Sequence, residues 1–270
     1  MLSFQAGASI AKGMIPIVGS PGTTTLRLVI AALILCAVQR PWRAVPSRTA
    51  APVVVAYGLA LGTMNFVFYL ALKTIPLGIA VGLEFTGPLA VALAASRRRV
   101  DLVWLTFAVV GLLCLVPIDR AGQTLDPAGV GWALMAGACW ALYIIFGQRA
   151  GRAHGSTAAA WGVLVAAIAI APIGVWQEGA ALLSRDVLPR GIAIAILSSA
   201  LPYSLEMTAL RRLSARLYGT LMSLEPAVAA LAGVALLHER LSLVQWLGIA
   251  AVMIASAGAL GHEPVADHAP

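Results

Sequence analysis

Two stretches of this sequence repeat one another and decide its architecture. Residues 71–93 read ALKTIPLGIAVGLEFTGPLAVAL, and residues 209–231 read ALRRLSARLYGTLMSLEPAVAAL. A constant offset of 138 residues aligns them, and each carries one carboxylate, Glu84 in the first and Glu225 in the second. We interpret the chain as two related halves. Chance likeness between two apolar stretches of similar composition is the alternative.

The composition indicates what surrounds the chain. Of its 270 residues, 60% are hydrophobic and 11% are charged, whereas about 25% of an average soluble protein is charged. Such a chain is too apolar to be disordered. The net charge of +7 does not indicate a nucleic-acid partner, because the basic residues form short clusters between apolar runs, as they do in the loops of membrane proteins. We therefore expect lipid as the solvent of most of the chain.

The apolar runs are long enough to cross a membrane as helices, which takes about 20 residues each. They are continuous rather than alternating, which argues against a membrane β-barrel. The predicted fold class is an all-α integral membrane protein of about ten transmembrane helices. Their predicted ranges are 1–15, 22–39, 52–73, 76–96, 102–118, 128–148, 157–176, 190–210, 215–236 and 242–261.

The predicted helices divide into two repeats of five. Residues 1–118 form the first repeat, residues 128–261 the second, and residues 262–270 a disordered cytoplasmic tail. An odd number of helices inverts the second repeat in the membrane, and many secondary transporters bind substrate between such inverted repeats, near the midplane. The first helix is shorter than its counterpart in the second repeat. Either this helix is itself truncated, or the working start lies upstream, which is the simpler explanation.

The distribution of basic residues predicts the orientation. With the amino terminus in the cytoplasm, the cytoplasmic loops hold eleven Lys and Arg, in the ranges 40–48, 97–99, 149–152 and 211–216, and the loops on the other side hold five. Cytoplasmic loops of membrane proteins carry the excess of positive charge. We therefore expect a multi-pass protein of the bacterial inner membrane with both termini in the cytoplasm.

Inserting a carboxylate into the middle of a membrane costs about 2.5–3.5 kcal/mol on the insertion scale, so an acidic residue there indicates a functional or structural role. Glu84 and Glu225 are expected near mid-membrane, on similar faces of equivalent helices. Each is close to a proline, Pro88 or Pro226, and a proline leaves backbone carbonyls free. We expect both acids to bind substrate or protons, a structural hydrogen bond being the alternative. Glu206 lies near the cytoplasmic end of its helix, where a salt bridge with a following arginine is an equal alternative.

Two basic residues, Lys12 and Arg27, lie in the outer parts of the first two predicted helices. The functional interpretation is that one of them meets a substrate carboxylate or pairs with a mid-membrane glutamate. The alternative is that these long side chains extend to the membrane surface. Other candidates for the lining of a cavity are Asn65, Tyr69, Trp140, Tyr143, Gln148, Tyr203, Tyr218 and Ser223.

The sequence contains no Ser-His-Asp arrangement, nucleotide-binding loop or HExxH motif, so we expect neither an enzyme nor a cofactor. Its three cysteines lie in apolar runs and its histidines in loops or the tail, so no metal site is indicated. Without a nucleotide site, active transport would have to use an ion gradient. Proton exchange through Glu84 or Glu225 is the natural candidate, because burial favours the neutral form of a carboxyl group.

Six stretches resemble a known family: residues 7–12, 26–28, 76–93, 137–143, 197–207 and 219–227. On these residues the chain resembles the drug/metabolite transporter superfamily, in its ten-helix branch built of two EamA repeats. Within that branch it is similar to the bacterial inner-membrane threonine and homoserine exporters. The resemblance implies efflux of small amino acids driven by the proton gradient. It departs from the family at the amino end, where the family's first helix is complete.

Other readings of the sequence remain open. The same fold exports other metabolites or drugs, and the size and aromatic content of the cavity would discriminate. An enzyme acting on lipid would need a polar catalytic cluster at headgroup level, and the short loops show none. A non-transporting sensor or scaffold usually has an appended soluble domain, which this sequence does not show.

Overall fold

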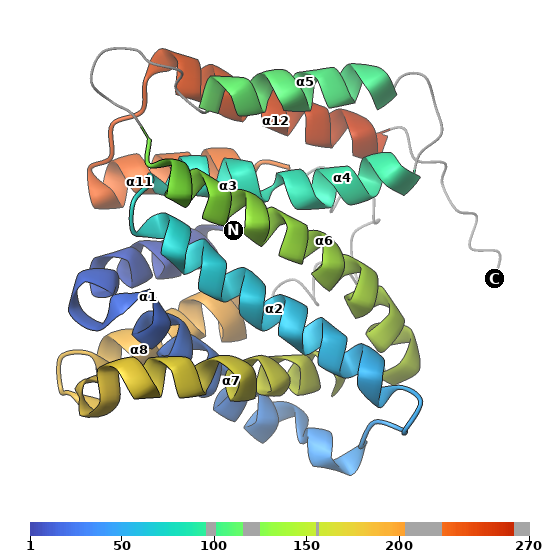
Figure 1. Ribbon diagram of the computed structural model, residues 1–270, viewed down its shortest axis with the longest axis vertical. Helices are drawn as coiled ribbons and strands as arrows, with labels where there is room; N and C mark the ends of the chain where they lie inside the picture. Colours follow the sequence, from blue (N-terminus) through green and yellow to red (C-terminus); the bar gives the residue numbers. More distant parts are fainter. Residues whose placement is uncertain (96–100, 116–124, 155–156, 203–222, 262–270) are drawn as a thin grey trace.

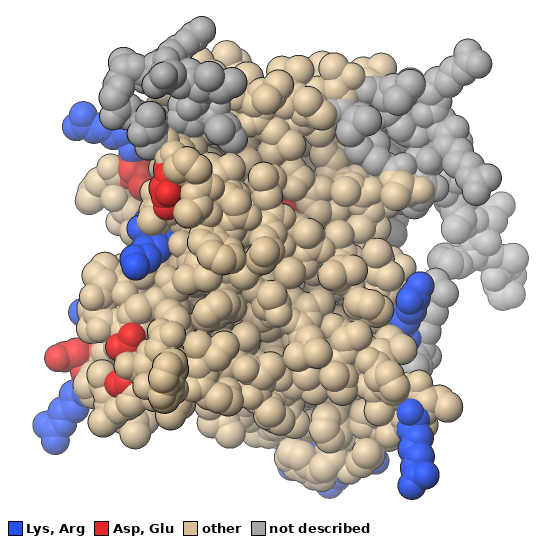
Figure 2. All heavy atoms as spheres, viewed as in Figure 1, with Lys and Arg blue, Asp and Glu red and all other residues tan. Residues whose placement is uncertain are grey.

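The protein is a packed array of helices. The computed structural model describes residues 1–95, 101–115, 125–154, 157–202 and 223–261, and every regular element within these ranges is helical. Many of the helices run in similar directions (Figure 1). Figure 2 shows Lys, Arg, Asp and Glu gathered at the two margins of the visible face, with a nearly uncharged belt between them. Charged rims around an apolar belt are typical of a protein that spans a bilayer, and the predicted all-α membrane fold is confirmed.

Helix α1 (Leu2–Gln39) joins the first two predicted helices. It leaves helical geometry at Val18 and Gly19, where Gly19 has a φ of 57°. Glycine adopts a positive φ without steric cost, so the chain bends between the predicted ranges 1–15 and 22–39.

The other elements lie within or near the remaining predicted ranges, of which residues 203–210 and 215–222 fall outside the described part of the chain. In the first half they are η1 (Pro41–Arg43), α2 (Ala51–Leu72), α3 (Leu77–Glu84), α4 (Thr86–Ala95) and α5 (Asp101–Leu115). In the second half they are α6 (Pro127–His154), α7 (Thr157–Glu178), η2 (Gly179–Leu183), α8 (Leu188–Ala195), η3 (Ile196–Ala200), α11 (Glu225–Leu237) and α12 (Leu243–Gly261).

The predicted helix 76–96 is divided in the structure into α3 and α4, which are separated at Phe85. Pro88 has no N–H to donate to the carbonyl of Glu84, and its ring crowds that carbonyl, so the helix is interrupted one turn earlier. A turn at Ser223 and Leu224 precedes α11, and the offset of 138 residues pairs Ser223 with Phe85. Non-helical positions therefore precede α4 and α11 at matching points of the two halves, whose relation as repeats stays a prediction.

The two halves pack across one another. Helix α2 packs against α6 and α7, α1 against α7 and α8, α3 against α11, and α5 against α12. Small residues permit the close approaches: a Cβ on Gly58 of α2 would lie 2.7 Å from the carbonyl oxygen of Gly162 in α7, and one on Gly78 of α3 would lie 2.5 Å from Cα of Ala230 in α11. Contacts of small residues are the usual means by which membrane helices come together.

The tightest of these crossings gives a stability prediction. A Cβ on Gly87 of α4 would overlap the carbonyl group of Gly137 in α6. We expect Gly87→Ala to destabilise the protein by about 1–3 kcal/mol, the usual cost of overpacking, as measured by its melting temperature in detergent. The matched control is Gly131→Ala on α6, where a Cβ would meet no atom within 4 Å. Equal melting temperatures for both variants would contradict this crossing.

The start of α6 carries a pH-sensitive cap outside the membrane-spanning segments. The Asp126 carboxylate accepts hydrogen bonds from the N–H groups of Ala128 at 3.2 Å and Gly129 at 3.3 Å. A bond from the side chain of Thr74, together with these N–H bonds, lowers the pKa of Asp126 below its ordinary value. The cap therefore contributes stability above the ordinary Asp range, near pH 4, and loses it as the pH falls through the lowered pKa. The melting-temperature difference between wild type and Asp126→Ala should shrink on acidification, and a constant difference would contradict the cap.

Candidate functional site

Two carboxylates lie next to the helix interruptions. Glu84 is the last residue of α3 and Glu225 the first of α11, and their side chains are buried, with 7% and 6% exposed. Glu84 interacts electrostatically with both Glu225 and Arg27. The structure thus brings together three of the residues that the sequence singled out.

Arg27 is buried in the second segment of α1, with 3% of its surface exposed. Its guanidinium donates to Tyr69 Oη at 3.2 Å, to the carbonyl of Ser198 at 3.1 Å and to Ser199 Oγ at 3.4 Å. It also lies over the rings of Phe4 and Tyr69, at 5.2 and 5.6 Å from their centroids. Such burial excludes the alternative that Arg27 extends to the membrane surface.

The guanidinium of Arg27 is held by neutral groups. In the described part of the chain, no carboxylate forms a salt bridge with it. A buried charge without a counterion is costly unless its hydrogen bonds and surroundings compensate. Glu84 interacts electrostatically with Arg27 without forming a salt bridge, so binding of a substrate anion by Arg27 stays a prediction.

The backbone partner of Arg27 comes from the π-helical turn η3. Single π-turns widen the helix locally and are frequent at functional sites. The start of α1 docks on this turn: Ser3 Oγ donates to the carbonyl of Leu197 at 2.7 Å, and Gly7 packs directly against Ser198. The glycine is needed because a Cβ at position 7 would overlap the Ser198 hydroxyl.

Gln5 joins this cluster, and the sequence reasoning missed it. Its side chain is fully buried, and Nε2 donates to Glu225 Oε1 at 3.3 Å. Its Oε1 is buried and has no hydrogen-bond partner among the described residues, and an unsatisfied buried acceptor costs about 1–3 kcal/mol. The available signal was the presence of an amide side chain within the first apolar run.

Lys12 pairs with Glu239 rather than with Glu84 or Glu225. Its Nζ forms a salt bridge with Glu239 Oε1 at 2.6 Å and donates to the carbonyl of Ile75 at 2.7 Å. Both oxygens of Glu239 also accept the N–H of Leu77, at 3.0 and 2.9 Å. The pair therefore joins α1, the start of α3 and the segment after α11. Among the alternatives left open for Lys12, the structure thus shows pairing with a carboxylate, but with a loop carboxylate that hydropathy does not single out.

This ion pair gives a second stability prediction. We expect Lys12→Met and Glu239→Gln each to destabilise the protein by about 2 kcal/mol, since a hydrogen bond to a charged group contributes about 1.5–3 kcal/mol. In the double variant the losses should not add, because both changes remove the same contact. The measurement is a double-mutant cycle on thermal unfolding, with the exposed Lys73→Met as control. Additive losses would show that the two residues do not act as a pair.

The remaining predicted residues are dispersed. Asn65 is buried and donates to the carbonyl of Leu61 in its own helix. Trp140 packs edge-on against Phe85, and Tyr143 stacks on Tyr57 with centroids 5.0 Å apart. The two aromatic pairs therefore pack α6 against α2 and against Phe85, the residue between α3 and α4.

The other predicted positions are accounted for as follows. Ser223 lies before α11 and donates to Ser256 of α12 at 3.1 Å, and Gln148 is exposed. Pro88 and Pro226 lie in the first turns of α4 and α11. Tyr203, Glu206 and Tyr218 lie outside the described residues. Among the described residues, no group of three or more His, Cys, Asp and Glu side chains is placed to hold a metal ion.

Comparison with known proteins places this arrangement in a family. The EamA-like transporter family matches residues 127–261. The threonine/homoserine exporters RhtA of Escherichia coli (strain K12) and Salmonella typhimurium (strain LT2) are each 53% identical over 258 residues, covering 96% of this chain and 88% of the relative. This chain belongs to the EamA-like transporter family. The resemblance read from the sequence is therefore confirmed, and the chain is a multi-pass membrane protein of a transporter family.

More distant proteins agree with that assignment. The uncharacterized transporter YwfM of Bacillus subtilis is 29% identical over 216 residues, covering 75% of this EamA-like chain and 71% of the relative. A crystal structure superposes with a TM-score of 0.62 at 20% identity, covering 96% of this chain and 94% of the other. That likeness shows a shared fold.

Proposed function

We propose that this EamA-like protein exports small amino acids, threonine and homoserine among them, across the bacterial inner membrane in exchange for protons. The exporters named above are similar along nearly the whole chain, and they support the substrate class. The orientation with both termini in the cytoplasm belongs to the same proposal and is supported by the excess of basic residues in the predicted cytoplasmic loops.

The observation that carries the proposal is the opposite charge of the buried groups. An amino acid at neutral pH carries one carboxylate and one ammonium group. Arg27 forms no salt bridge with a carboxylate in the described structure and suits the first. Glu84 and Glu225 suit the second, and Glu84 interacts electrostatically with Arg27. Within an apolar surrounding such charge contacts act more strongly than in water, so these groups favour a small zwitterion.

The same acids support proton exchange. Two carboxylates close together in an apolar interior disfavour each other's charged form, so they do not readily ionise together. Binding of an ammonium group at the pair favours release of a proton, and arrival of a proton favours release of the ammonium group. Substrate and proton then bind alternately to one site, so the export of substrate is coupled to the entry of a proton.

The test is efflux of labelled threonine and homoserine from proteoliposomes that contain the purified protein. An imposed proton gradient should accelerate efflux, and a protonophore should remove the acceleration. If the protonophore does not change the rate of efflux, proton exchange is rejected, while export of the amino acids is still supported. No efflux of either amino acid, from protein shown to be folded, would reject the substrate class and favour other small metabolites.

A further inference from the structure

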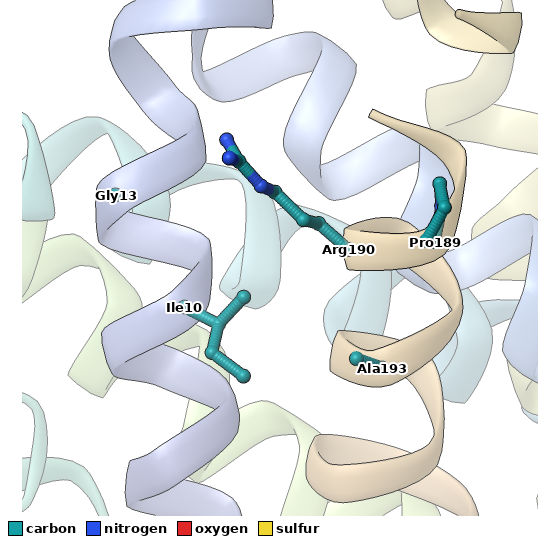
Figure 3. A pocket seen from close by; sticks show the side chains of 5 residues that line it. All are labelled: Ile10, Gly13, Pro189, Arg190 and Ala193. Carbon is teal, nitrogen blue, oxygen red and sulfur yellow. The ribbon is translucent and has the colours of Figure 1, made fainter. Parts of the chain in front are cut away.

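A groove separate from the Arg27 cluster opens between α1 and α8. It has a volume of about 480 Å³ and is lined by Ile10 and Gly13 of α1 and by Pro189, Arg190 and Ala193 of α8. Figure 3 shows Ile10 projecting from α1 into the space between the helices, opposite Ala193. A Cβ on Gly13 would meet no atom within 4 Å, so the groove is open at that turn.

The apolar walls continue beyond the groove. Ile17 of α1 lies one turn past Gly13 and is 49% exposed, and Ile196 follows Ala193 in the chain by three residues and is 43% exposed. Residues three and four apart share one side of a helix. An exposed apolar groove in a membrane protein faces acyl chains, because lipid is the solvent at that depth.

The groove is lined by one basic residue, Arg190. Arg190 is the third residue of α8, and Figure 3 shows its side chain extending from α8 across the groove toward the turn of α1 that carries Gly13. No carboxylate in the described ranges forms a salt bridge with it. The nearby charged residues in the chain are Arg185 and Asp186, both exposed in the segment before α8, and Lys12, which is paired with Glu239.

We propose that this groove is a binding site for an anionic phospholipid, with the headgroup phosphate at Arg190 and an acyl chain along Ile10, Gly13 and Ala193. Arginine is well suited to phosphate because its planar guanidinium presents paired donors. A zwitterionic lipid binds more weakly, since its own ammonium group competes with Arg190 for the phosphate. Contacts of the acyl chain with the apolar walls make the groove prefer a lipid over a soluble anion.

The site has a mechanical consequence. The first segment of α1 and the turn η3, which follows α8 directly, also meet at the Arg27 cluster, where Phe4 contacts the guanidinium and the carbonyl of Ser198 accepts its hydrogen bond. A lipid bound in the groove contacts both α1 and α8 and so restricts their movement relative to one another. Binding of lipid therefore stabilises the arrangement in which Arg27 is held.

The test is native mass spectrometry of the purified protein titrated separately with phosphatidylglycerol and phosphatidylcholine. Arg190→Gln should weaken phosphatidylglycerol binding about fivefold, as expected for loss of one basic contact with an anionic lipid. It should weaken phosphatidylcholine binding by a smaller factor, because the ammonium group of that lipid already offsets part of the contact between its phosphate and Arg190. Gly13→Leu should weaken both by filling the groove. The matched control, Arg185→Gln, removes an exposed arginine that does not line the groove and should leave both unchanged.

Three outcomes would overturn the proposal. Equal binding of phosphatidylglycerol by wild type and Arg190→Gln would remove the headgroup contact. An equal loss in Arg185→Gln would show diffuse attraction by surface charge. Competition by glycerol phosphate as effective as that by phosphatidylglycerol would indicate an anion site without a tail. Circular dichroism and gel filtration establish that each variant is folded before it is titrated.

Discussion

Export of threonine and homoserine should fall about 30-fold or more in Arg27→Gln, because losing one partner of a buried charged contact costs about 2–5 kcal/mol and about 1.4 kcal/mol corresponds to a factor of ten. Glutamine keeps part of the hydrogen bonding to Ser198 and Tyr69 but has no charge to hold a carboxylate. The measurement is the initial rate of efflux from proteoliposomes at several internal substrate concentrations.

Two further variants separate binding from folding. Arg27→Lys keeps the charge but loses the planar guanidinium, which makes three hydrogen bonds to Tyr69, Ser198 and Ser199, so its rate should lie between wild type and Arg27→Gln. Arg43→Gln removes an exposed arginine and should leave the rate unchanged. A wild-type rate in Arg27→Gln would show that the guanidinium does not bind the substrate.

Glu84→Ala and Glu225→Ala should each reduce efflux about tenfold or more, because each removes a buried carboxylate that would pair with the substrate's ammonium group, and a buried polar group left without its partner is costly. Glu206→Ala should reduce it less, since that residue is predicted near the cytoplasmic end of its helix. The measurement is again the initial rate of efflux, at matched amounts of folded protein. Equal, mild losses in all three variants would contradict this ranking.

The acid that carries the proton is identified by Glu→Gln substitutions at the same positions. A variant that has lost the proton-carrying group should still exchange threonine across the membrane, but its net efflux should no longer respond to a proton gradient. If Glu225→Gln behaves in this way and Glu84→Gln does not, Glu225 carries the proton and Glu84 serves binding. An unchanged response in both variants would remove both residues from the coupling.

Much of the architecture follows from local sequence. The apolar runs predict helices at the right places because burial of a backbone in lipid requires internal hydrogen bonds. Gly19 and Pro88 mark the bend in α1 and the interruption at Phe85, since each acts on the backbone within one turn. Burial of Glu84 and Glu225 follows from their apolar surroundings, and the family follows from long matching stretches in both halves.

The sequence by itself therefore determined a helical membrane protein of a transporter family with two acids in apolar runs, because hydropathy and backbone geometry are local properties. Only the tertiary structure decided which polar side chains meet. Arg27 is 171 residues from Ser198, Gln5 is 220 from Glu225, and Lys12 is 227 from Glu239. Such pairings depend on how α1 packs against η3, α11 and the segment after it, and no local pattern encodes that packing. These side chains interact only once the folded chain has brought α1 next to η3, α11 and the segment after it, because each pair is distant in sequence.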